Sequence, residues 1–186
     1  MEKAECPRWF GYFLINPFRR FLENPRRILG PLVREGMTVL EPGCGMGYFT
    51  LPLARMVGPQ GRVVAVEIQS RMLAVLERRA RRSHLLDRLE LRLSKGPGLG
   101  VGDLTGRVDF ATALHMVHEV PDPERFFREV WDCLKPGGKL LFIEPSHRVS
   151  QEQFETSVAI GETIGFQREA MDAKIRGRAA LLGKKE

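Results

Sequence analysis

Three glycines spaced two residues apart are the first feature of the sequence that could support chemistry. They lie at positions 43, 45 and 47 in the segment Glu41-Pro-Gly-Cys-Gly-Met-Gly47, and glycine lets a backbone turn tightly and approach a ligand closely. A carboxylate, Glu67, follows 20 residues after Gly47, at the end of an apolar run. A carboxylate at the carboxyl end of a strand can accept hydrogen bonds from both hydroxyl groups of a ribose. The loop and Glu67 together predict a nucleoside-binding site.

The spacing of these glycines differs from the GxGxxG pattern of dinucleotide-binding loops, because Tyr48 stands where that pattern has its third glycine. A pyrophosphate favours bare amide donors at a helix N-terminus, whereas the carboxylate of Glu41 would repel a phosphate. The same carboxylate would attract a cation such as the ammonium group of an amino acid. The residues therefore favour a nucleoside joined to a zwitterion and rank NAD lower.

The elements that must position these residues alternate along the chain. Short apolar runs, most of them β-branched or aromatic, predict five strands at residues 38–41, 62–67, 89–93, 108–114 and 139–144. Stretches of helical period lie between most of them. This alternation is typical of an α/β fold with a parallel sheet and helices on both faces. Two further short strands are expected around Gly177.

Capping residues indicate where the helices begin and end. One helix is predicted to open near Thr50. Others are predicted from a Ser70 cap to about residue 82, from an Asp122 cap to a stop at 135–138, and from a Ser150 cap to Gly165. The crossover between the third and fourth strands carries glycines at 96, 98, 100 and 102, which oppose a helix. A flexible loop is expected there.

Four motifs in order along the chain resemble those of class I S-adenosylmethionine-dependent methyltransferases, in particular the small-molecule group that includes ubiquinone-biosynthesis enzymes. The motifs are VLEPGCGMGYFT, VVAVEIQSRML, DFATALHMVHEVPD and LKPGGKLLFIEP, and the resemblance covers roughly residues 30–145. It implies a Rossmann-like sandwich whose sheet has seven strands, mostly parallel with the last antiparallel, between helices on both faces. It also implies S-adenosylmethionine as cofactor, with S-adenosylhomocysteine as product.

The resemblance assigns roles to individual residues as well. Glu41 and the glycine loop are expected to hold the methionine part of the cofactor, and Glu67 its ribose. Ile68 and Met72 are expected at the faces of the adenine, although Met72 fits an ordinary helix core equally well. The family often has an acidic or polar side chain after strand three, where this chain reads Ser-Lys-Gly-Pro, so Leu99 or backbone groups would replace it. The full set of expected cofactor contacts is Glu41, Gly43, Cys44, Gly45, Gly47, Glu67, Ile68, Met72, Leu99 and His115.

Two histidines after the fourth strand are candidate catalytic residues. His115 matches a position that lines the cofactor and faces the substrate in the family, and His118 follows on the next turn. Methyl transfer is an in-line displacement that positioning alone can accelerate, so a base is optional and an ordinary hydrogen-bonding role stays open for both. Glu144, at the end of strand five, is either a further candidate or a strand-end cap. The candidate acceptor contacts are Trp9, Tyr12 and Glu119.

The composition of the chain narrows its class. Its 186 residues, 43% hydrophobic and 28% charged, fit one soluble domain that buries a core. We expect residues 31–186 to form the cofactor-binding core and residues 1–30, rich in aromatic side chains, to form a helical arm or lid. No apolar run reaches the length of a membrane span, and three scattered cysteines suggest neither disulfides nor a metal site. A cytoplasmic location is expected.

The leading hypothesis is an enzyme that methylates a small-molecule acceptor. The net charge of +6 and the arginine clusters admit RNA as a partner, but the chain has no Asn/Asp-Pro-Pro-Tyr signature after strand four and no appended RNA-binding motif. A module that binds the cofactor without catalysis is one alternative. A metalloid or thiol methyltransferase that uses Cys6 and Cys44 is another. The acceptor and the oligomeric state stay open at this point.

Overall fold

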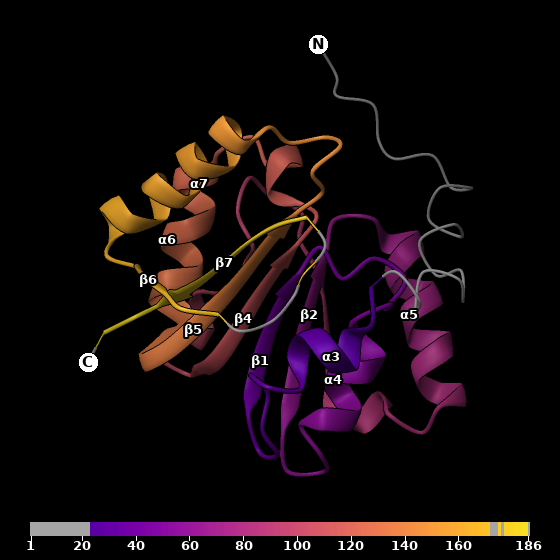
Figure 1. Ribbon diagram of the computed structural model, residues 1–186. Helices are drawn as coiled ribbons and strands as arrows, with labels where there is room; N and C mark the ends of the chain where they lie inside the picture. The colour runs from indigo at the N-terminus through magenta and orange to yellow at the C-terminus, as the bar shows by residue number, and fades with distance from the viewer. Residues whose placement is uncertain (1–22, 172–174, 176, 186) are drawn as a thin grey trace.

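Seven strands form one mixed sheet in the computed structural model, which describes residues 23–171, 175 and 177–185 (Figure 1). Their order across the sheet is β3-β2-β1-β4-β5-β7-β6. The strands are β1 Thr38–Pro42, β2 Arg62–Glu67, β3 Leu89–Leu93, β4 Val108–Leu114, β5 Leu134–Glu144, β6 Gln167–Glu169 and β7 Arg178–Gly183. Strands β1 to β5 are parallel and β7 runs antiparallel to β5. The predicted fold class is confirmed.

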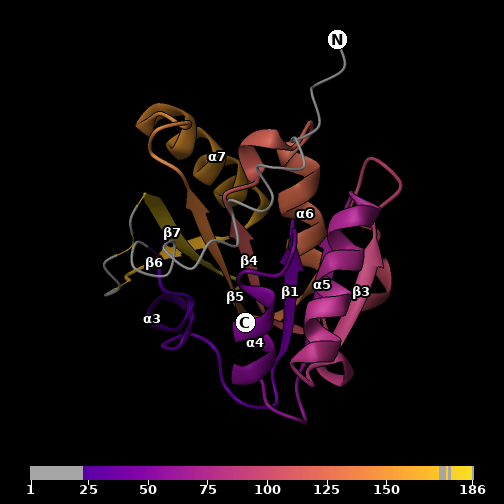
Figure 2. The same ribbon diagram turned by 90° about the vertical axis from the view of Figure 1, so that its right-hand side faces the viewer.

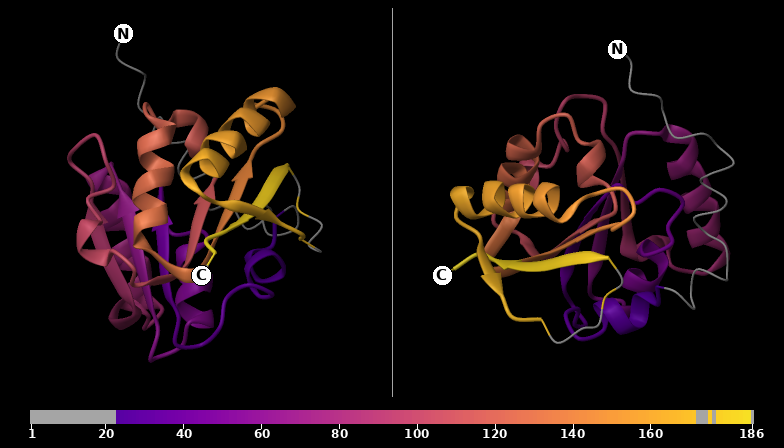
Figure 3. Two further views of the ribbon diagram at one scale, coloured as in Figure 1. Left: turned by 90° about the vertical axis from the view of Figure 1, so that its left-hand side faces the viewer. Right: turned by 45° about the horizontal axis from the view of Figure 1, so that its top comes forward.

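Helices cover both faces of this sheet. The α-helices are α3 Pro25–Leu29, α4 Thr50–Met56, α5 Ser70–Arg82, α6 Pro123–Cys133 and α7 Gln151–Ile164, and the short 3₁₀ turns are η1 Leu86–Arg88, η2 Gly102–Leu104 and η3 Val117–Glu119. Helices α3, α4 and α5 lie on one face (Figure 2), and α6 and α7 lie on the other (Figure 3, left). Successive residues of a strand face opposite layers, so Leu140 and Phe142 pack toward α6 and α7 while Leu141 and Ile143 pack toward α3, α4 and α5. Burial on both sides explains the continuous apolar runs.

Two of the predicted helix caps form as expected. The Asp122 side chain accepts a hydrogen bond from the amide of Arg125 at the start of α6, where Pro123 occupies the first turn. Ser150 and Gln153 form a reciprocal capping box at the start of α7. Gly165, with a φ of +132°, ends α7 in a conformation that other residues rarely adopt. These local signals fix the ends of both helices on that face of the sheet.

The predicted cap of α5 is wrong by one residue. Ser70 is the first helical residue, and the N-cap is Gln69, whose side chain makes no capping hydrogen bond. The reason lies in Glu67, whose carboxylate accepts hydrogen bonds from the amides of Ile68 and Gln69 at 2.8 and 3.0 Å. A side chain from the end of β2 therefore satisfies amides at the entrance to this helix.

Strand β5 begins at Leu134, whereas the apolar run in the sequence predicts a start at Lys139. Helix α6 ends at Cys133 and the strand follows directly, so the residues of the predicted stop lie within β5. The pairing with β4 is irregular there, because Val108 pairs with Leu134 and the next pair joins Phe110 to Lys139. Gly137, with a φ of +75°, lies in this irregular segment. A bulged beginning of this kind leaves no continuous apolar pattern to detect.

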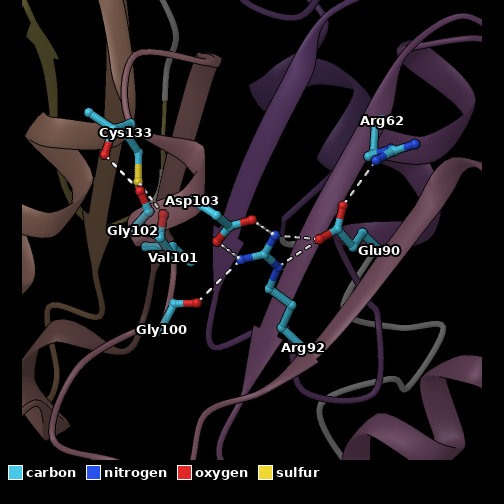
Figure 4. Close-up of polar contacts among 9 residues, drawn as sticks. Arg62, Glu90, Arg92, Gly100, Val101, Gly102, Asp103 and Cys133 are labelled. Atoms are coloured by element: carbon cyan, nitrogen blue, oxygen red, sulfur yellow. Dashed lines mark hydrogen bonds and ion pairs between the residues drawn. The ribbon is translucent and has the colours of Figure 1, made fainter.

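The crossover between β3 and β4 contains no α-helix, as its glycines predict, and a group of charged side chains fastens it to β3. Arg92 donates to Asp103 at 2.6 and 2.7 Å and to the carbonyl of Gly100 at 3.2 Å (Figure 4). Glu90 accepts a second contact from Arg92, at 2.7 Å, and one from Arg62 at 3.1 Å. Hydrogen bonding to Arg92 lowers the pKa of Asp103. Hydrogen bonding to Asp103 and Glu90 raises the pKa of Arg92. We call these four side chains the Arg92 cluster.

The search for membrane-spanning helices covered the residues that the structure describes. None of their helices combines the length and the apolar character that crossing a bilayer requires.

Candidate functional site

Most of the described site residues predicted from the sequence gather at one edge of the sheet, where β1, β2, β4 and β5 end. Strand order reverses there, because β1 has β2 on one side and β4 on the other. Open α/β sheets bind ligands outside the carboxyl ends of strands at such a switch point. The loop after β4 meets the loop after β1, since a Cβ on Gly43 would lie 3.1 Å from the Met116 side chain. The geometry is that of a ligand site formed by several loops.

The glycine loop after β1 has a backbone conformation in which residues other than glycine would be strained. Gly43, Gly45 and Gly47 have φ angles of +68°, +54° and +84°. The Gly43 amide donates to the carbonyl of Val66 at 2.8 Å, which holds the loop beside β2. A Cβ on Gly47 would overlap Leu76, whereas a Cβ on Gly45 would meet no described atom within 4 Å. Packing therefore requires Gly47, while Gly45 borders open space.

Glu67 is buried, with 6% of its surface exposed, and it already serves the protein itself. Its Oε1 accepts hydrogen bonds from the amides of Ile68 and Gln69, and its Oε2 accepts one from Gly45 at 2.9 Å. An ionised carboxylate offers about four acceptor positions. One position on Oε2 is therefore left for a ligand while the contact to the glycine loop is kept.

Glu41 is a buried carboxyl group beside this loop, with 3% of its surface exposed. Burial raises the pKa of Glu41 to about 8, the negative Glu67 adds to the rise, and the nearby Thr50 hydroxyl opposes it. Among the atoms that the structure describes, Oε2 of Glu41 and Oγ1 of Thr50 have no hydrogen-bond partner within normal geometry. An unpartnered buried carboxyl oxygen is costly unless a ligand supplies a donor or a positive charge.

The pKa of Glu41 in the folded state is about 8, so its carboxyl group keeps its proton until the pH approaches that value. We therefore expect the free energy of unfolding to fall as the pH rises. The unfolded chain releases this proton near pH 4.5, so the penalty grows from about pH 4.5 to about pH 8. Its size is on the order of 3 to 5 kcal/mol. Urea unfolding at several pH values should therefore show that Glu41→Gln reduces the loss of stability across this window. An identical pH dependence in the variant would contradict the assignment.

Cys44 lies in the glycine loop with 6% of its surface exposed. Burial, reinforced by the nearby Glu41 and Glu67, raises the pKa of its thiol well above the usual value. Since the thiolate is the nucleophilic form, this environment disfavours Cys44 as a reactive group. Cys6, its suggested partner, lies outside the described residues. The alternative of a thiol-based methyltransferase therefore gains no support.

Glu23, the first described residue, contacts two parts of the site. Its carbonyl accepts a hydrogen bond from the Tyr48 hydroxyl at 2.6 Å, and its carboxylate contacts Nε2 of His115. His115 itself has a left-handed backbone, with a φ of +60°, and its amide donates to the carbonyl of Ile143 at 2.8 Å. His115 is thus held by β5 on one side and by Glu23 on the other.

His118 forms a second pair with a carboxylate, Glu144, at the end of β5. Its Nδ1 lies 2.7 Å from Oε2 of Glu144, and its backbone amide donates to Oε1 at 3.0 Å. Glu144 is only 1% exposed. The carboxylate accepts hydrogen bonds, so Nδ1 donates and Nε2 is left as the acceptor nitrogen. Both contacts fix the orientation of the imidazole.

The candidate adenine contacts are divided between two places. Ile68 is 70% exposed directly after β2, whereas Met72 is 7% exposed in the first turns of α5. Leu99 packs against the core beneath α6, and its amide donates to Glu129 at 2.5 Å. Leu99 lines a cavity of about 350 Å³ that residues 92–102 form with α6, and the described lining includes neither Ile68 nor Met72. The free structure does not bring these three candidates together.

Several contacts at the site had no detectable signal in the sequence. Glu23 pairs with a histidine 92 positions away, and Arg79 of α5 donates to the carbonyl of Met46 in the glycine loop.

Glu119, a predicted acceptor contact, is 59% exposed, and its carboxylate lies 3.7 Å from Nε2 of His118. The other two predicted acceptor contacts, at positions 9 and 12, lie outside the described residues. Within the described part of the chain, no group of three or more His, Cys, Asp or Glu side chains is arranged to hold a metal ion.

Comparison with known proteins identifies similar sequences. Residues 40–142 match the protein family described as a methyltransferase domain. The chain is 30% identical over 114 residues to a demethylmenaquinone methyltransferase of Lactobacillus johnsonii, covering 61% of this chain and 46% of that protein. It is 35% identical over 112 residues to the ubiquinone/menaquinone biosynthesis C-methyltransferase UbiE of an Enterobacter species, covering 60% and 44%. The chain thus spans about half the length of these curated relatives.

Solved structures resemble the whole described fold more completely. A methyltransferase from Aquifex aeolicus, described as dependent on S-adenosylmethionine, superposes with a TM-score of 0.83 and covers 96% of this chain and 99% of its own, at 24% identity. A second, from Methanococcus maripaludis, has a TM-score of 0.77 at 16% identity and covers 100% of this chain and 98% of its own. At these identities the likeness shows a shared fold.

Proposed function

This chain belongs to the methyltransferase domain family of class I S-adenosylmethionine-dependent enzymes, and from that membership we propose that it methylates a small-molecule acceptor with S-adenosylmethionine. One observation carries the proposal furthest. The glycine loop, Glu41 and Glu67 meet at the switch point of the sheet, where a carboxyl oxygen is buried without a described partner and Gly45 borders open space. The family resemblance drawn from the four motifs is confirmed.

These residues fit the parts of the proposed cofactor. The ammonium group of its methionine part would favour the ionised form of Glu41, which is otherwise disfavoured by burial. The remaining acceptor position of Glu67 would take a ribose hydroxyl. Ile68, exposed beside Glu67, would cover a face of the adenine. When bound, S-adenosylmethionine supplies a methyl group on a positively charged sulfur.

The protein's own contribution would be chiefly positioning. The loops after β1 and β4 touch through Gly43 and Met116, so the methionine part and the acceptor would be held side by side. Holding a nucleophile near its target in line replaces a bimolecular encounter by a reaction between neighbours. Of the two related methyltransferases described above, one is named for demethylmenaquinone and the other for ubiquinone/menaquinone biosynthesis. An aromatic small molecule is therefore a reasonable first acceptor to test.

We expect S-adenosylhomocysteine to raise the melting temperature, while NAD and ATP leave it unchanged. A ligand at 100 times its Kd stabilises the folded state by about 2.7 kcal/mol. For a chain of this length the shift is about 5 to 10 °C. Differential scanning fluorimetry over a ligand series measures it, with adenosine and methionine as fragment controls. Equal shifts from NAD and S-adenosylhomocysteine would contradict the proposed site. Release of S-adenosylhomocysteine in the presence of an acceptor then separates an enzyme from a binding module.

A further inference from the structure

The peptide group between Met46 and Gly47 in the glycine loop is held at both of its polar atoms. The carbonyl of Met46 accepts a hydrogen bond from Nη1 of Arg79, a residue of α5. The amide of Gly47 donates to the carbonyl of Cys44 at 3.0 Å. One contact within the loop and one side chain from a helix therefore set the direction of this peptide group.

A glycine-rich loop needs such contacts because its peptide groups can turn over at little cost. Glycine adopts positive and negative φ angles about equally readily, so the φ of +84° at Gly47 is not fixed by the residue itself. Turning the peptide group over would direct the Met46 carbonyl away from Arg79 and the Gly47 amide away from Cys44. The hydrogen bond from a charged guanidinium opposes this change, because charge-assisted hydrogen bonds are stronger than neutral ones.

Arg79 belongs to the face of α5 that packs on the loop. Leu76 lies three residues earlier, and residues three apart are neighbours on a helix surface. A Cβ on Gly47 would overlap Leu76, so this face touches the loop directly. Arg79 is half-buried, and burial lowers the pKa of its guanidinium. A charge partly removed from water is costly unless it is hydrogen-bonded, and the Met46 carbonyl supplies the acceptor.

We propose that Arg79 is a positioning residue for the cofactor, which holds the Met46 carbonyl so that the glycine loop keeps the conformation that binds S-adenosylmethionine. This inference rests on the proposed function. In that conformation the Gly45 amide donates to Glu67 at 2.9 Å and Gly45 borders open space. Without the Arg79 contact the loop would populate other conformations. The apparent affinity would then fall in proportion to the fraction of molecules that stays competent to bind.

The first test measures binding of S-adenosylhomocysteine by isothermal titration calorimetry. Arg79→Met keeps much of the apolar stem of the side chain but cannot donate, so the Kd should rise about 10- to 100-fold, the range for a hydrogen bond to a charged group. Arg79→Lys can donate to the same carbonyl and should recover most of the affinity. Arg78→Met removes the same charge at the exposed neighbouring position and should bind like the wild-type protein.

A shorter ligand locates the effect within the site. 5′-Methylthioadenosine has the nucleoside and the thioether of S-adenosylhomocysteine but lacks the amino and carboxyl groups of the methionine part. In the proposed function the glycine loop and Glu41 hold that part, whereas Glu67 and Ile68 hold the nucleoside. Arg79→Met should therefore weaken binding of S-adenosylhomocysteine more than binding of 5′-methylthioadenosine. A general loss of structure would weaken both equally.

A spectroscopic measurement needs no ligand. The ¹⁵N chemical shift of an amide responds to hydrogen bonding at the carbonyl of the same peptide group, so the amide of Gly47 reports on the Met46 carbonyl. In protein labelled with ¹⁵N-glycine, the Gly47 signal should move in Arg79→Met and stay in place in Arg78→Met. Gly106, at a distant exposed turn, is the internal reference. The Gly45 amide should also exchange faster with solvent in Arg79→Met, because its contact with Glu67 weakens.

The outcomes separate this inference from the proposed function. Wild-type affinity for S-adenosylhomocysteine in Arg79→Met would overturn the positioning role, and so would an equal loss of affinity for 5′-methylthioadenosine. Failure of Arg79→Lys to recover affinity would overturn the role of the hydrogen bond. Failure of S-adenosylhomocysteine to bind the wild-type protein would instead overturn the proposed function, while the Gly47 signal would still show whether Arg79 holds the loop.

Discussion

Replacing Gly45 by valine should remove measurable binding of S-adenosylhomocysteine while the domain stays folded. The position has a φ of +54°, where a β-branched side chain is strained, and a Cβ there would project into open space beside the loop. If that space receives the cofactor, the valine methyl groups occupy it. The amide of Gly45 also donates to Glu67 at 2.9 Å, and a distorted loop would lose this contact. Isothermal titration calorimetry measures the loss.

Two further variants separate blocking of the ligand from strain in the backbone. Gly45→Ala keeps the strain, about 1 to 2 kcal/mol, but adds only a methyl group, so it should weaken binding less. Gly106→Val adds the same side chain at an exposed turn with a φ of +64° and nothing nearby, so it should lose stability and retain binding. Full affinity in Gly45→Val would mean that the loop only turns the chain.

Replacing Phe127 by alanine should cost about 3 to 5 kcal/mol of unfolding free energy. Its side chain is fully buried beneath α6. The ring makes edge-to-face contacts with Phe126, Phe142 and Phe166 at centroid distances of 5.4, 5.6 and 6.4 Å. These contacts join α6, β5 and the segment that follows α7, so the cavity cannot close by the shift of one element. Denaturant unfolding monitored by circular dichroism gives the value.

Arg128→Ala is the matched control for this prediction, because it lies one residue further along α6 with its side chain 57% exposed. It loses only an exposed ion pair with Glu124, worth less than about 1 kcal/mol. A loss below about 1 kcal/mol in Phe127→Ala as well would show that the aromatic layer can repack.

The sequence predicts the sheet well where burial is continuous. The runs that became β2 and β4 match the structure at both ends, because parallel strands covered on both faces need mostly apolar residues. The run that became β3 matches as well, through the alternation of a half-buried edge strand. The start of β5 was missed because its first residues form a bulge with polar and glycine residues. The Asp122 and Ser150 caps act through neighbours three residues away, so local sequence reveals them.

The site was predictable only in its framework. The glycine loop and Glu67 follow from spacing, because both lie directly after strands. The pairing of His118 with Glu144 depends instead on β4 lying next to β5, which brings residues 26 positions apart into contact. The burial that raises the pKa of Glu41 comes from the surrounding tertiary structure. Spacing along one chain contains no information about such enclosure.

The Arg92 cluster has a consequence for how the protein behaves at high concentration. Strand β3 is one edge of the sheet, and an uncovered edge can pair with a strand of another molecule. Glu90 and Arg92 place paired charges along that edge, with the 95–103 crossover fastened beside them. The opposite edge, β6, is only three residues long. A second molecule would have to break the ion pairs at one edge and would find few free backbone groups at the other, so the sheet resists growth into aggregates.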